Sequence, residues 1–322
     1  MRILITGGAG YIGAHIVDLL CDKNYNVIVF DNLSSGFQEN LNEKSIFFKG
    51  DLTKMDDLDY IFKKYKIDSI IHMAAYKSVE DSMINSEIYT NNNIIGSINL
   101  ISAAIKYGVN KFIFSSTAAI YGNLNNSPID ETASPNPINH YGFTKLYIEQ
   151  YLDWISNIND IRFVCLRYFN AAGYTEKNDL IKFKEKEPSN LLPIVMEVAN
   201  GTRNQINIYG SDYNTKDGTC IRDYIHVIDL ATAHIKAIDY LSSNKRLIVN
   251  LSTGRGYSVL DVIKIAEKIT SQEIKYKFVN RRLGDPAELI SNTTRSKKEL
   301  KWFAKFSDME KIIESMWKIY SK

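Results

Sequence analysis

The sequence predicts an α/β fold, in which a doubly wound parallel sheet carries helices on both faces and a second, smaller α+β domain follows. Short runs rich in β-branched residues alternate with longer segments of helical periodicity through the first half of the chain, as repeated β-α-β units do. This regularity ends after about Asn170, and a chain of 322 residues exceeds the usual size of a single core. We therefore expect one domain at residues 1–170, rejoined by a segment near residues 222–240, and a second domain at residues 171–322.

The individual elements follow from the two periodicities, alternation for strands and a 3.6-residue repeat for helices. Strands are expected at residues 2–6, 26–30, 45–49, 69–72, 111–115 and 162–167, and helices between them at residues 11–21, 58–65, 94–106 and 144–155. Later in the chain, residues 179–188 and 210–218 have the composition of loops, whereas residues 258–270, with Ser258 as N-cap, and 307–319 have helical periodicity.

Composition and charge exclude several classes of protein. The formal net charge is only +2, and Lys and Arg are scattered among Asp and Glu, so we expect no nucleic-acid partner. Cys21, Cys165 and Cys220 lie far apart without a C-x-x-C pair, which argues against a disulfide scaffold and a metal site. No apolar stretch approaches the ~20 residues that span a bilayer, and no leader precedes the first strand. We expect a cytoplasmic protein without membrane contact.

A glycine-rich segment follows the first expected strand, at the point where that strand turns into a helix. Gly7, Gly10 and Gly13 satisfy G-x-x-G-x-x-G, and the segment also satisfies G-x-G-x-x-G. Gly7 permits a tight turn, Gly10 lets the backbone approach a pyrophosphate, and Gly13 allows close helix packing, while the helix N-terminus offers N–H groups to phosphate. The segment predicts a Rossmann-type dinucleotide site, and glycines in a plain turn are the simpler alternative.

An acidic residue stands at the end of the second expected strand. Asp31 lies within the ~20-residue interval expected for the acid that binds an adenosine ribose. Its carboxylate can accept bonds from both ribose hydroxyls and repels a 2′-phosphate, so NAD is favoured over NADP. A strand-capping Asp31 is the alternative, which the order of strand, glycines, helix, strand and acid disfavours. Asp51 and Leu52 suit the adenine edge, although an exposed turn also explains Asp51.

Tyr141 and Lys145 form a Y-x-x-x-K element, whose spacing of about one helical turn places both side chains on one face. An unperturbed tyrosine, with a pKa of about 10, is a poor base, but a neighbouring ammonium and a positive nicotinamide ring favour the phenolate. We expect Tyr141 to take a proton from a carbinol while the nicotinamide takes the hydride, and Lys145 to bind the nicotinamide ribose. Thr117, at the end of the fifth strand, is the hydroxyl expected on the reacting oxygen, or else it closes a turn, and Tyr121 is expected to pack in the interior.

These segments together resemble the extended short-chain dehydrogenase/reductase superfamily and, more closely, the UDP-glucose 4-epimerases. The resemblance runs nearly end to end. It rests on residues 6–13, 31–33, 72–75, 114–122, 141–145, 166–170, 217–227 and 281–285, of which the last three separate nucleotide-sugar epimerases from other members.

The resemblance implies the residues of two adjoining binding sites. Tightly bound NAD is expected to contact Gly7, Gly10, Tyr11, Ile12, Gly13, Asp31, Asn32, Asp51, Leu52, Met73, Lys77, Asn92, Tyr141, Lys145 and Phe169. A UDP-hexose is expected to contact Lys77, Thr117, Tyr141, Asn170, Asn190, Leu191, Arg222, Arg282, Asp285 and Leu289. Guanidinium forks suit a diphosphate, and a structural salt bridge is the alternative for each arginine.

The implied reaction is an epimerisation at C4 of the sugar. The sugar is oxidised to a 4-keto form, rotates about its link to the diphosphate and is reduced on its other face. Leu289 stands where members restricted to UDP-glucose carry a bulky Tyr, so the resemblance predicts that UDP-GlcNAc and UDP-GalNAc are interconverted as well. It also implies a homodimer that pairs through residues 94–106 and 144–155.

Three other functions compete with this interpretation. A nucleotide-sugar 4,6-dehydratase is disfavoured because Ala118 and Ala119 stand where that chemistry needs an acid/base pair. A UDP-xylose or UDP-uronate 4-epimerase stays open, since the sequence discriminates poorly among pyranoses on one nucleotide. A non-catalytic NAD sensor needs neither Tyr141 nor Lys145.

Overall fold

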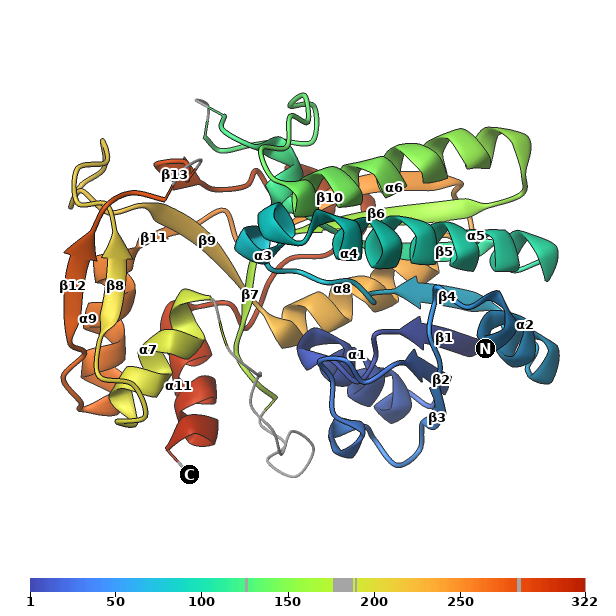
Figure 1. The fold of residues 1–322 in the computed structure, drawn as a ribbon, viewed down its shortest axis with the longest axis horizontal. Coiled ribbons are helices and arrows are strands. Elements are labelled where there is room, and N and C mark those ends of the chain that lie inside the picture. The colour runs from blue at the N-terminus through green and yellow to red at the C-terminus, as the bar shows by residue number, and fades with distance from the viewer. Residues whose placement is uncertain (125–126, 176–187, 189, 283–284, 322) are drawn as a thin grey trace.

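A seven-stranded parallel sheet forms the centre of the first domain of the computed structural model, which describes residues 1–124, 127–175, 188, 190–282 and 285–321. The strand order is β10-β6-β5-β4-β1-β2-β3 (Figure 1). The strands are β1 (Arg2–Thr6), β2 (Asn26–Asp31), β3 (Ile46–Lys49), β4 (Ser69–His72), β5 (Lys111–Thr117), β6 (Arg162–Tyr168) and β10 (Arg246–Leu251). The order reverses at β1, and such a switch point opens a crevice at the carboxyl ends of the strands. The predicted fold class is confirmed.

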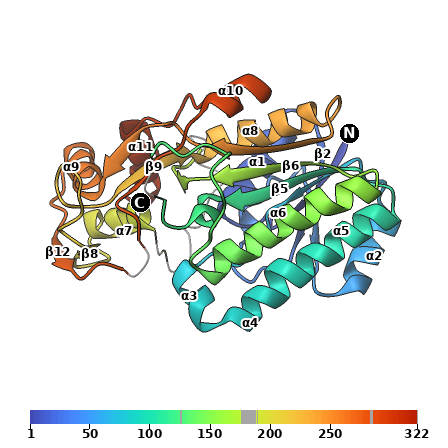
Figure 2. The same cartoon turned by 90° about the horizontal axis from the view of Figure 1, so that it is seen from above.

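Helices cover both faces of this sheet because its strands are apolar on both sides. Ile3 and Ile5 of β1 join a core with α1 (Tyr11–Asp22) and α8 (Val227–Tyr240). Leu4 between them faces the opposite core, which α2 (Met55–Lys64), α5 (Gly96–Lys106) and α6 (His140–Ile158) complete. Figure 2 shows α5 and α6 running side by side over that face. The alternation of strand side chains thus builds two cores, as a doubly wound sheet requires.

The helix at the Y-x-x-x-K element begins four residues earlier than the sequence predicts. The side chain of Asn139 accepts a hydrogen bond from the backbone N–H of Gly142 at 2.8 Å, and this N-cap starts α6 at His140. Periodicity missed the start because the first turn contains a glycine and few apolar residues. Tyr141 consequently lies in the first turn of α6, and Lys145 lies one turn further on the same helix.

A separate core belongs to the smaller domain. It is formed by α7 (Leu191–Ala199), α9 (Val259–Thr270), α11 (Met309–Tyr320) and β8 (Ile206–Tyr209), which pairs with β12 (Tyr276–Val279). A further sheet joins β7 (Asn170–Ala172), β9 (Ile221–His226), β11 (Gly256–Ser258) and β13 (Glu288–Leu289). Ser258 is the predicted N-cap of α9 and forms a full capping box with Asp261. Figure 1 shows this domain beside the parallel sheet.

The chain returns from the smaller domain to the parallel sheet. After β9, helix α8 packs against α1, and β10 adds a strand beside β6. A return near residues 222–240 was expected, whereas the strand at 246–251 was not. The remaining helices of the described residues are α3 (Val79–Ile84), α4 (Ser86–Tyr89), α10 (Thr294–Glu299) and the short η1 (Gln38–Asn40), η2 (Thr90–Ile95) and η3 (Ala118–Tyr121). Residues 179–187 of the expected loop at 179–188 lie outside the described part of the chain.

The described residues contain neither a membrane-spanning helix nor a cluster of metal-ligating side chains. None of the helices within them is long and apolar enough to cross a membrane. Within the same ranges, no group of three or more His, Cys, Asp or Glu side chains is arranged to hold a metal ion.

Candidate active site

A cleft of about 900 Å³ opens at the carboxyl edge of the parallel sheet. Its walls come from the segments that follow β1 to β4, from the end of β5 and from the first turns of α6. Tyr168, at the end of β6, also lines the cleft, so six strands that end at the same edge contribute to it. This is the place where the sheet topology predicts a ligand.

The glycine-rich turn lines one wall of the cleft. Gly7 has a φ of +71°, and a Cβ there would lie 2.6 Å from the backbone nitrogen of Ala74. A Cβ on Gly13 would lie 2.3 Å from the carbonyl oxygen of Gly7, so α1 packs directly on the turn. The roles predicted for these two glycines are those that the structure shows.

Gly10 has a different environment from its two neighbours in the motif. The nearest protein atom to a Cβ on it is the Gly7 oxygen at 3.4 Å, so packing alone does not require a glycine at this position. Gly10 lines the cleft as the N-cap residue of α1, and no side chain caps the helix. The free N–H groups at this helix end can bind a pyrophosphate, which the bare Cα of Gly10 would let approach.

Asp31 lies at the end of β2 in the same cleft and is 8% exposed. Its two carboxylate oxygens accept hydrogen bonds from the N–H of Ala9 at 3.0 Å and of Leu33 at 2.8 Å. Burial raises the pKa of Asp31, and these two hydrogen bonds offset part of that effect. A carboxylate has about four acceptor positions, so two remain for ribose hydroxyls. Asp31 both ties the glycine turn to the next loop and can hold a ribose.

Asp51 lies next to Asp31 along the cleft. Its Oδ1 accepts hydrogen bonds from the backbone N–H and the hydroxyl of Thr53, and Asn32 donates to its Oδ2 at 3.5 Å. Burial pushes the pKa of Asp51 upward, but the hydrogen bonds outweigh it and the net pKa is lowered. Asp51 is therefore an anion. Its hydrogen bonds within the turn do not prevent it from also contacting a ligand in the cleft.

Tyr141 and Thr117 face each other where α6 meets the end of β5. The side chain of Thr117 acts on the phenol of Tyr141 as a polar neighbour that lowers its pKa, and the Oγ1 of Thr117 accepts from the N–H of Ala119 at 3.2 Å. Burial raises the pKa of Tyr141 to about 12, while Thr117 acts in the opposite direction. Thr117 therefore both closes the turn and presents its hydroxyl to the phenol, so the two interpretations of this residue are not exclusive.

Lys145 lies beneath Tyr141 in the cleft and is 4% exposed. Its Nζ donates to the backbone oxygen of Ser115 at 2.9 Å and lies 6.0 Å from the centre of the Tyr141 ring. Burial lowers the pKa of Lys145 to about 7, and the charge of Glu149 raises it. The expectation that this ammonium lowers the pKa of Tyr141 is not met by the protein groups alone, because burial dominates at both residues.

The structure brings almost all predicted cofactor residues into this one cleft. The cleft-lining members are Gly7, Gly10, Tyr11, Ile12, Gly13, Asp31, Asn32, Asp51, Leu52, Met73, Lys77, Asn92, Tyr141 and Lys145. Asn92 belongs to η2, a π-helical turn of the kind often found at functional sites. Phe169 instead is 7% exposed in a small apolar cluster with Ala118 and Ile120. The lining offers amides for phosphates, a carboxylate for a ribose and a lysine further along, a donor set that fits NAD.

The predicted substrate residues fall into two groups. Lys77 and Tyr141 line the cleft, while Arg222, Asp285 and Leu289 gather around β9 of the smaller domain. Arg222 forms an ion pair with Asp285 at 2.9 Å and stands in register with Leu289 on β13. The salt bridge offered as the alternative for Arg222 is thus present.

The other predicted substrate residues lie along the same domain. Asn170, on β7 beside β9, donates to the backbone oxygen of Asp223 at 2.8 Å. The guanidinium of Arg282 lies 3.9 Å from the centre of the Tyr209 ring. Asn190 and Leu191 stand at the start of α7.

Sequence reasoning missed a buried charged pair that joins α6 to β6. Glu149, one turn beyond Lys145, binds Arg167 of β6, and neither side chain is more than 5% exposed. Glu149 carried no motif that could have singled it out. Arg167 lies within the segment 166–170, and an arginine inside an apolar strand is a signal for a buried partner. Tyr121 is fully buried, as predicted, and donates to Asn250 at 2.7 Å.

Comparison with known proteins places this arrangement in a family. The model of the NAD dependent epimerase/dehydratase family matches residues 3–252. A UDP-glucose 4-epimerase of Lacticaseibacillus casei is 41% identical over 318 residues, which are 98% of this chain and 96% of the relative. The structure of a UDP-glucose 4-epimerase from Brucella ovis in complex with NAD has a TM-score of 0.96, with 36% identity and coverage of 99% of this chain and 98% of that one.

A third similar protein is named for two substrates. The UDP-Glc/GlcNAc 4-epimerase from Campylobacter jejuni is 39% identical, has a TM-score of 0.87 and covers 99% of this chain and 98% of its own. These matches agree with the glycine turn, Asp31 and the Tyr141–Lys145 pair, and they confirm NAD as the cofactor. The chain belongs to the NAD-dependent epimerase/dehydratase family and, within it, to the UDP-glucose 4-epimerases.

Proposed function

We propose that this protein interconverts UDP-glucose and UDP-galactose by transient oxidation at C4 of the sugar. The observation that carries the proposal is that Tyr141, with Thr117 as its polar neighbour, lines the same cleft as the glycine turn and Asp31. A proton acceptor and a dinucleotide site then adjoin each other. NAD, when bound, supplies the group that accepts the hydride and returns it.

Different residues of the chain position the sugar and remove its proton. Thr117 holds the 4-hydroxyl of the sugar against Tyr141, which removes its proton. With a pKa of about 12, Tyr141 stays protonated near neutral pH and cannot accept a proton, so the positive charges that reach the cleft after binding must favour its phenolate. Arg222, supported by Asp285, anchors the diphosphate, so the keto sugar turns without leaving.

An assay with UDP-galactose and no added cofactor tests this function. UDP-glucose should form to equilibrium with the purified protein, with no net change of NAD oxidation state. Formation of a 4-keto-6-deoxy product would indicate the dehydratase instead, and NAD binding without turnover would indicate the sensor. A panel that includes UDP-xylose and a UDP-uronate decides among the pyranoses.

A second proposal concerns the sugars accepted. Leu289 of β13 packs against the cluster of Ala118, Ile120 and Phe169, next to the end of β5 that presents Thr117. A leucine leaves more volume there than a tyrosine, enough to favour an N-acetyl group at C2. The Campylobacter neighbour, named for both sugars, supports the same view. We therefore propose that UDP-GlcNAc and UDP-GalNAc are substrates as well.

Substitution of Leu289 separates the two sugar pairs. In Leu289→Tyr, turnover of the acetylated pair should fall at least about tenfold while turnover of UDP-galactose stays within about threefold, because the added ring fills only the space beside C2. Product identification for both pairs, in wild type and variant, measures this. Undetectable activity of the wild type on UDP-GlcNAc rules out the broad specificity.

We also propose a homodimer that pairs through α5 and α6. The outer face of α6 carries Phe143, Tyr147, Trp154 and Ile158, and Trp154 and Ile158 are each 70% exposed. Large apolar side chains at helical spacing on one open face are typical of a helix interface. Light scattering should give twice the chain mass for wild type and the monomer mass for Trp154→Glu. A monomeric wild type contradicts the proposal.

The cytoplasm is the proposed location. Cys21, Cys165 and Cys220 are all free thiols, and the first two are buried. Free thiols throughout fit a reducing compartment. Cell fractionation with an antibody checks this placement.

A further inference from the structure

A buried network of charges lies directly behind the Tyr141–Lys145 pair. Arg167 binds both oxygens of Glu149, with Nη2 to Oε2 at 2.7 Å and Nε to Oε1 at 3.1 Å. The hydroxyl of Ser116 donates to Oε1 of Glu149 at 2.5 Å. Residues of two strands, β5 and β6, therefore hold the carboxylate of Glu149. Because Glu149 belongs to α6, these bonds fix the helix to both strands.

Two side chains of α6 clamp consecutive residues of β5. Lys145 donates to the backbone oxygen of Ser115 at 2.9 Å, and Glu149 accepts from Ser116. The next residue along β5 is Thr117, the partner of Tyr141. A helix attached to a strand at two successive residues cannot slide or turn against it. The clamp thus sets the distance between the Tyr141 hydroxyl and Thr117.

Glu149 also controls the charge around Lys145. The titratable groups facing Lys145 are Tyr141 and Glu149 on α6, His72 on β4, and Tyr168 with Arg167 on β6. Burial lowers the pKa of His72 to about 3, so it is neutral and offers no compensation. Glu149 is the anion among these groups. Without its charge, Arg167 would lose its buried ion-pair partner and Lys145 would lose the one charge that favours its ammonium form.

We propose that Glu149 is a positioning residue of the reaction, which favours the charged form of Lys145 and locks α6 against β5 so that Tyr141 meets Thr117. The inference rests on the proposed epimerase function. Burial lowers the pKa of Lys145 to about 7 and Glu149 opposes that effect, which agrees with the geometry.

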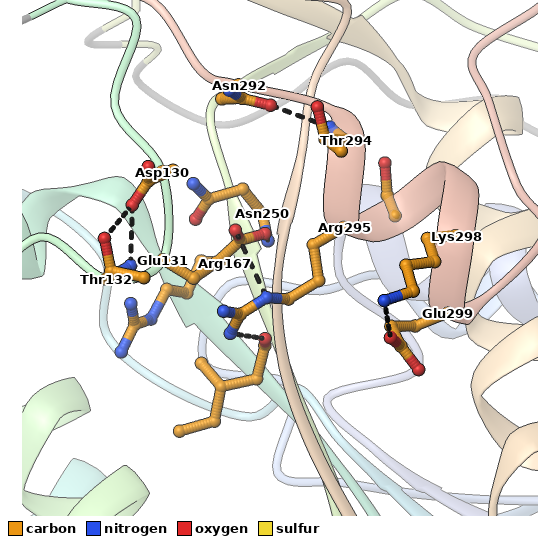
Figure 3. A network of polar contacts seen from close by, with 12 residues as sticks. Asp130, Glu131, Thr132, Arg167, Asn250, Asn292, Thr294, Arg295, Lys298 and Glu299 are labelled. Carbon is orange, nitrogen blue, oxygen red and sulfur yellow. Dashed lines mark hydrogen bonds and ion pairs between the residues drawn. The ribbon is translucent and has the colours of Figure 1, made fainter.

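The rest of the network offers a matched control. From Arg167 the hydrogen bonds continue through Tyr121 and Asn250 to Glu131, whose Oε1 accepts from the N–H of Asn250 at 2.8 Å. Glu131 is 3% exposed and also faces Arg295 at 3.5 Å (Figure 3). It is a buried glutamate of the same network, but Arg167, Tyr121 and Asn250 separate it from Lys145. Glu131→Gln therefore tests a general loss of structure without touching the clamp.

The experiment measures kcat and KM for UDP-galactose against pH in wild type, Glu149→Gln and Glu131→Gln. In Glu149→Gln the alkaline limb of kcat should move to lower pH by about one unit or more, and kcat at pH 8 should fall about tenfold, with KM changed less than about threefold. Glu131→Gln should keep the wild-type pH profile, and Glu149→Asp should restore most of it. A wild-type profile in Glu149→Gln, or an equal displacement in Glu131→Gln, overturns the inference.

A second readout does not depend on turnover. In protein with ¹³C-labelled lysine, the Lys145 signal is identified by its loss in Lys145→Met, and its titration is followed by NMR. The midpoint should fall in Glu149→Gln and stay in Glu131→Gln. If wild type does not convert UDP-galactose, the proposed function fails, but the Lys145 titration still tests the role of Glu149. If wild type converts UDP-galactose and the midpoint of the Lys145 titration is unchanged in Glu149→Gln, only the present inference fails.

A variant that keeps every charge covers the case in which Glu149→Gln does not fold. Ser116→Ala removes the hydroxyl that fixes Glu149. It should lower kcat about three- to tenfold and leave KM and the alkaline limb in place, since about one hydrogen bond of positioning is lost. An unchanged kcat contradicts the clamp.

Discussion

Gly13 and Gly10 are required in the glycine turn for different physical reasons. The backbone of the glycine turn lies close to Gly13. A Cβ added at Gly13 would lie 2.3 Å from the Gly7 oxygen and 2.8 Å from the Cα of Gly8. Gly10 has space for that atom but lines the cleft. One glycine is therefore required by packing, and the other by the ligand that the cleft is built to hold.

Alanine at the two positions should reveal this difference. Gly13→Ala should lower the free energy of unfolding by about 1–3 kcal/mol through overpacking, and it should also weaken NAD binding. Gly10→Ala should cost less than about 1 kcal/mol of stability yet weaken NAD binding at least as much. Urea unfolding and a fluorescence titration with NAD measure the two effects. Equal loss of stability in both variants contradicts the assignment.

The phenol of Tyr141 is the predicted proton acceptor. Tyr141→Phe should reduce kcat for UDP-galactose by about 10²- to 10⁴-fold, the usual contribution of general acid–base catalysis, because phenylalanine has no group that can accept the proton. Tyr276→Phe, at an exposed position of β12, is the control and should keep wild-type activity. If Tyr141→Phe turns over as fast as wild type, Tyr141 is not the base.

The N-terminal caps of the helices fix the positions of the functional side chains that follow them. Asn139 and Ser258 each cap a helix with a side-chain oxygen, and the cap of Ser258 was visible in the sequence because an apolar repeat follows it directly. The start of α6 was not, since Tyr141 and Gly142 break the apolar pattern. The Y-x-x-x-K spacing nevertheless placed both side chains on one helical face.

The cap of α9 should carry measurable stability. Ser258→Ala removes the hydrogen bond to the N–H of Asp261 at 3.0 Å and a buried bond with Asp217, so we expect a loss of about 1–2 kcal/mol. Asp308 begins α11 without any side-chain cap bond, and Asp308→Ala should cost less than about 1 kcal/mol. Urea denaturation of both variants tests this, and equal losses would show that the cap contributes nothing special.

Over the whole molecule, buried neutral histidines should set the acid limit of stability. Burial lowers the pKa of His15 and His234 to about 4 and of His72 and His226 to about 3. The unfolded chain binds protons near pH 6.5 but the folded protein does not, so stability is complete above pH 6.5 and falls as the pH drops toward 4. Each pKa unit corresponds to about 1.4 kcal/mol.

The unfolding midpoint in urea should therefore decrease steadily from pH 7 to pH 5. His15→Asn should flatten part of this dependence, because Asn can replace the Nδ1 hydrogen bond to the Tyr11 oxygen at 2.8 Å and does not titrate. A midpoint that stays constant over this range would mean that the histidines are charged in the folded protein.

Local patterns in the sequence by themselves determined the parallel sheet, the glycine turn with Asp31 and the Tyr141–Lys145 pair, because each is written within one or two neighbouring elements. Only the tertiary structure decided that β10 completes the sheet, that burial moves the pKa of Lys145 to about 7, and that Glu149 and Arg167 stand behind the site. Burial and charge depend on residues brought together from distant parts of the chain, and no periodicity encodes which of them will meet.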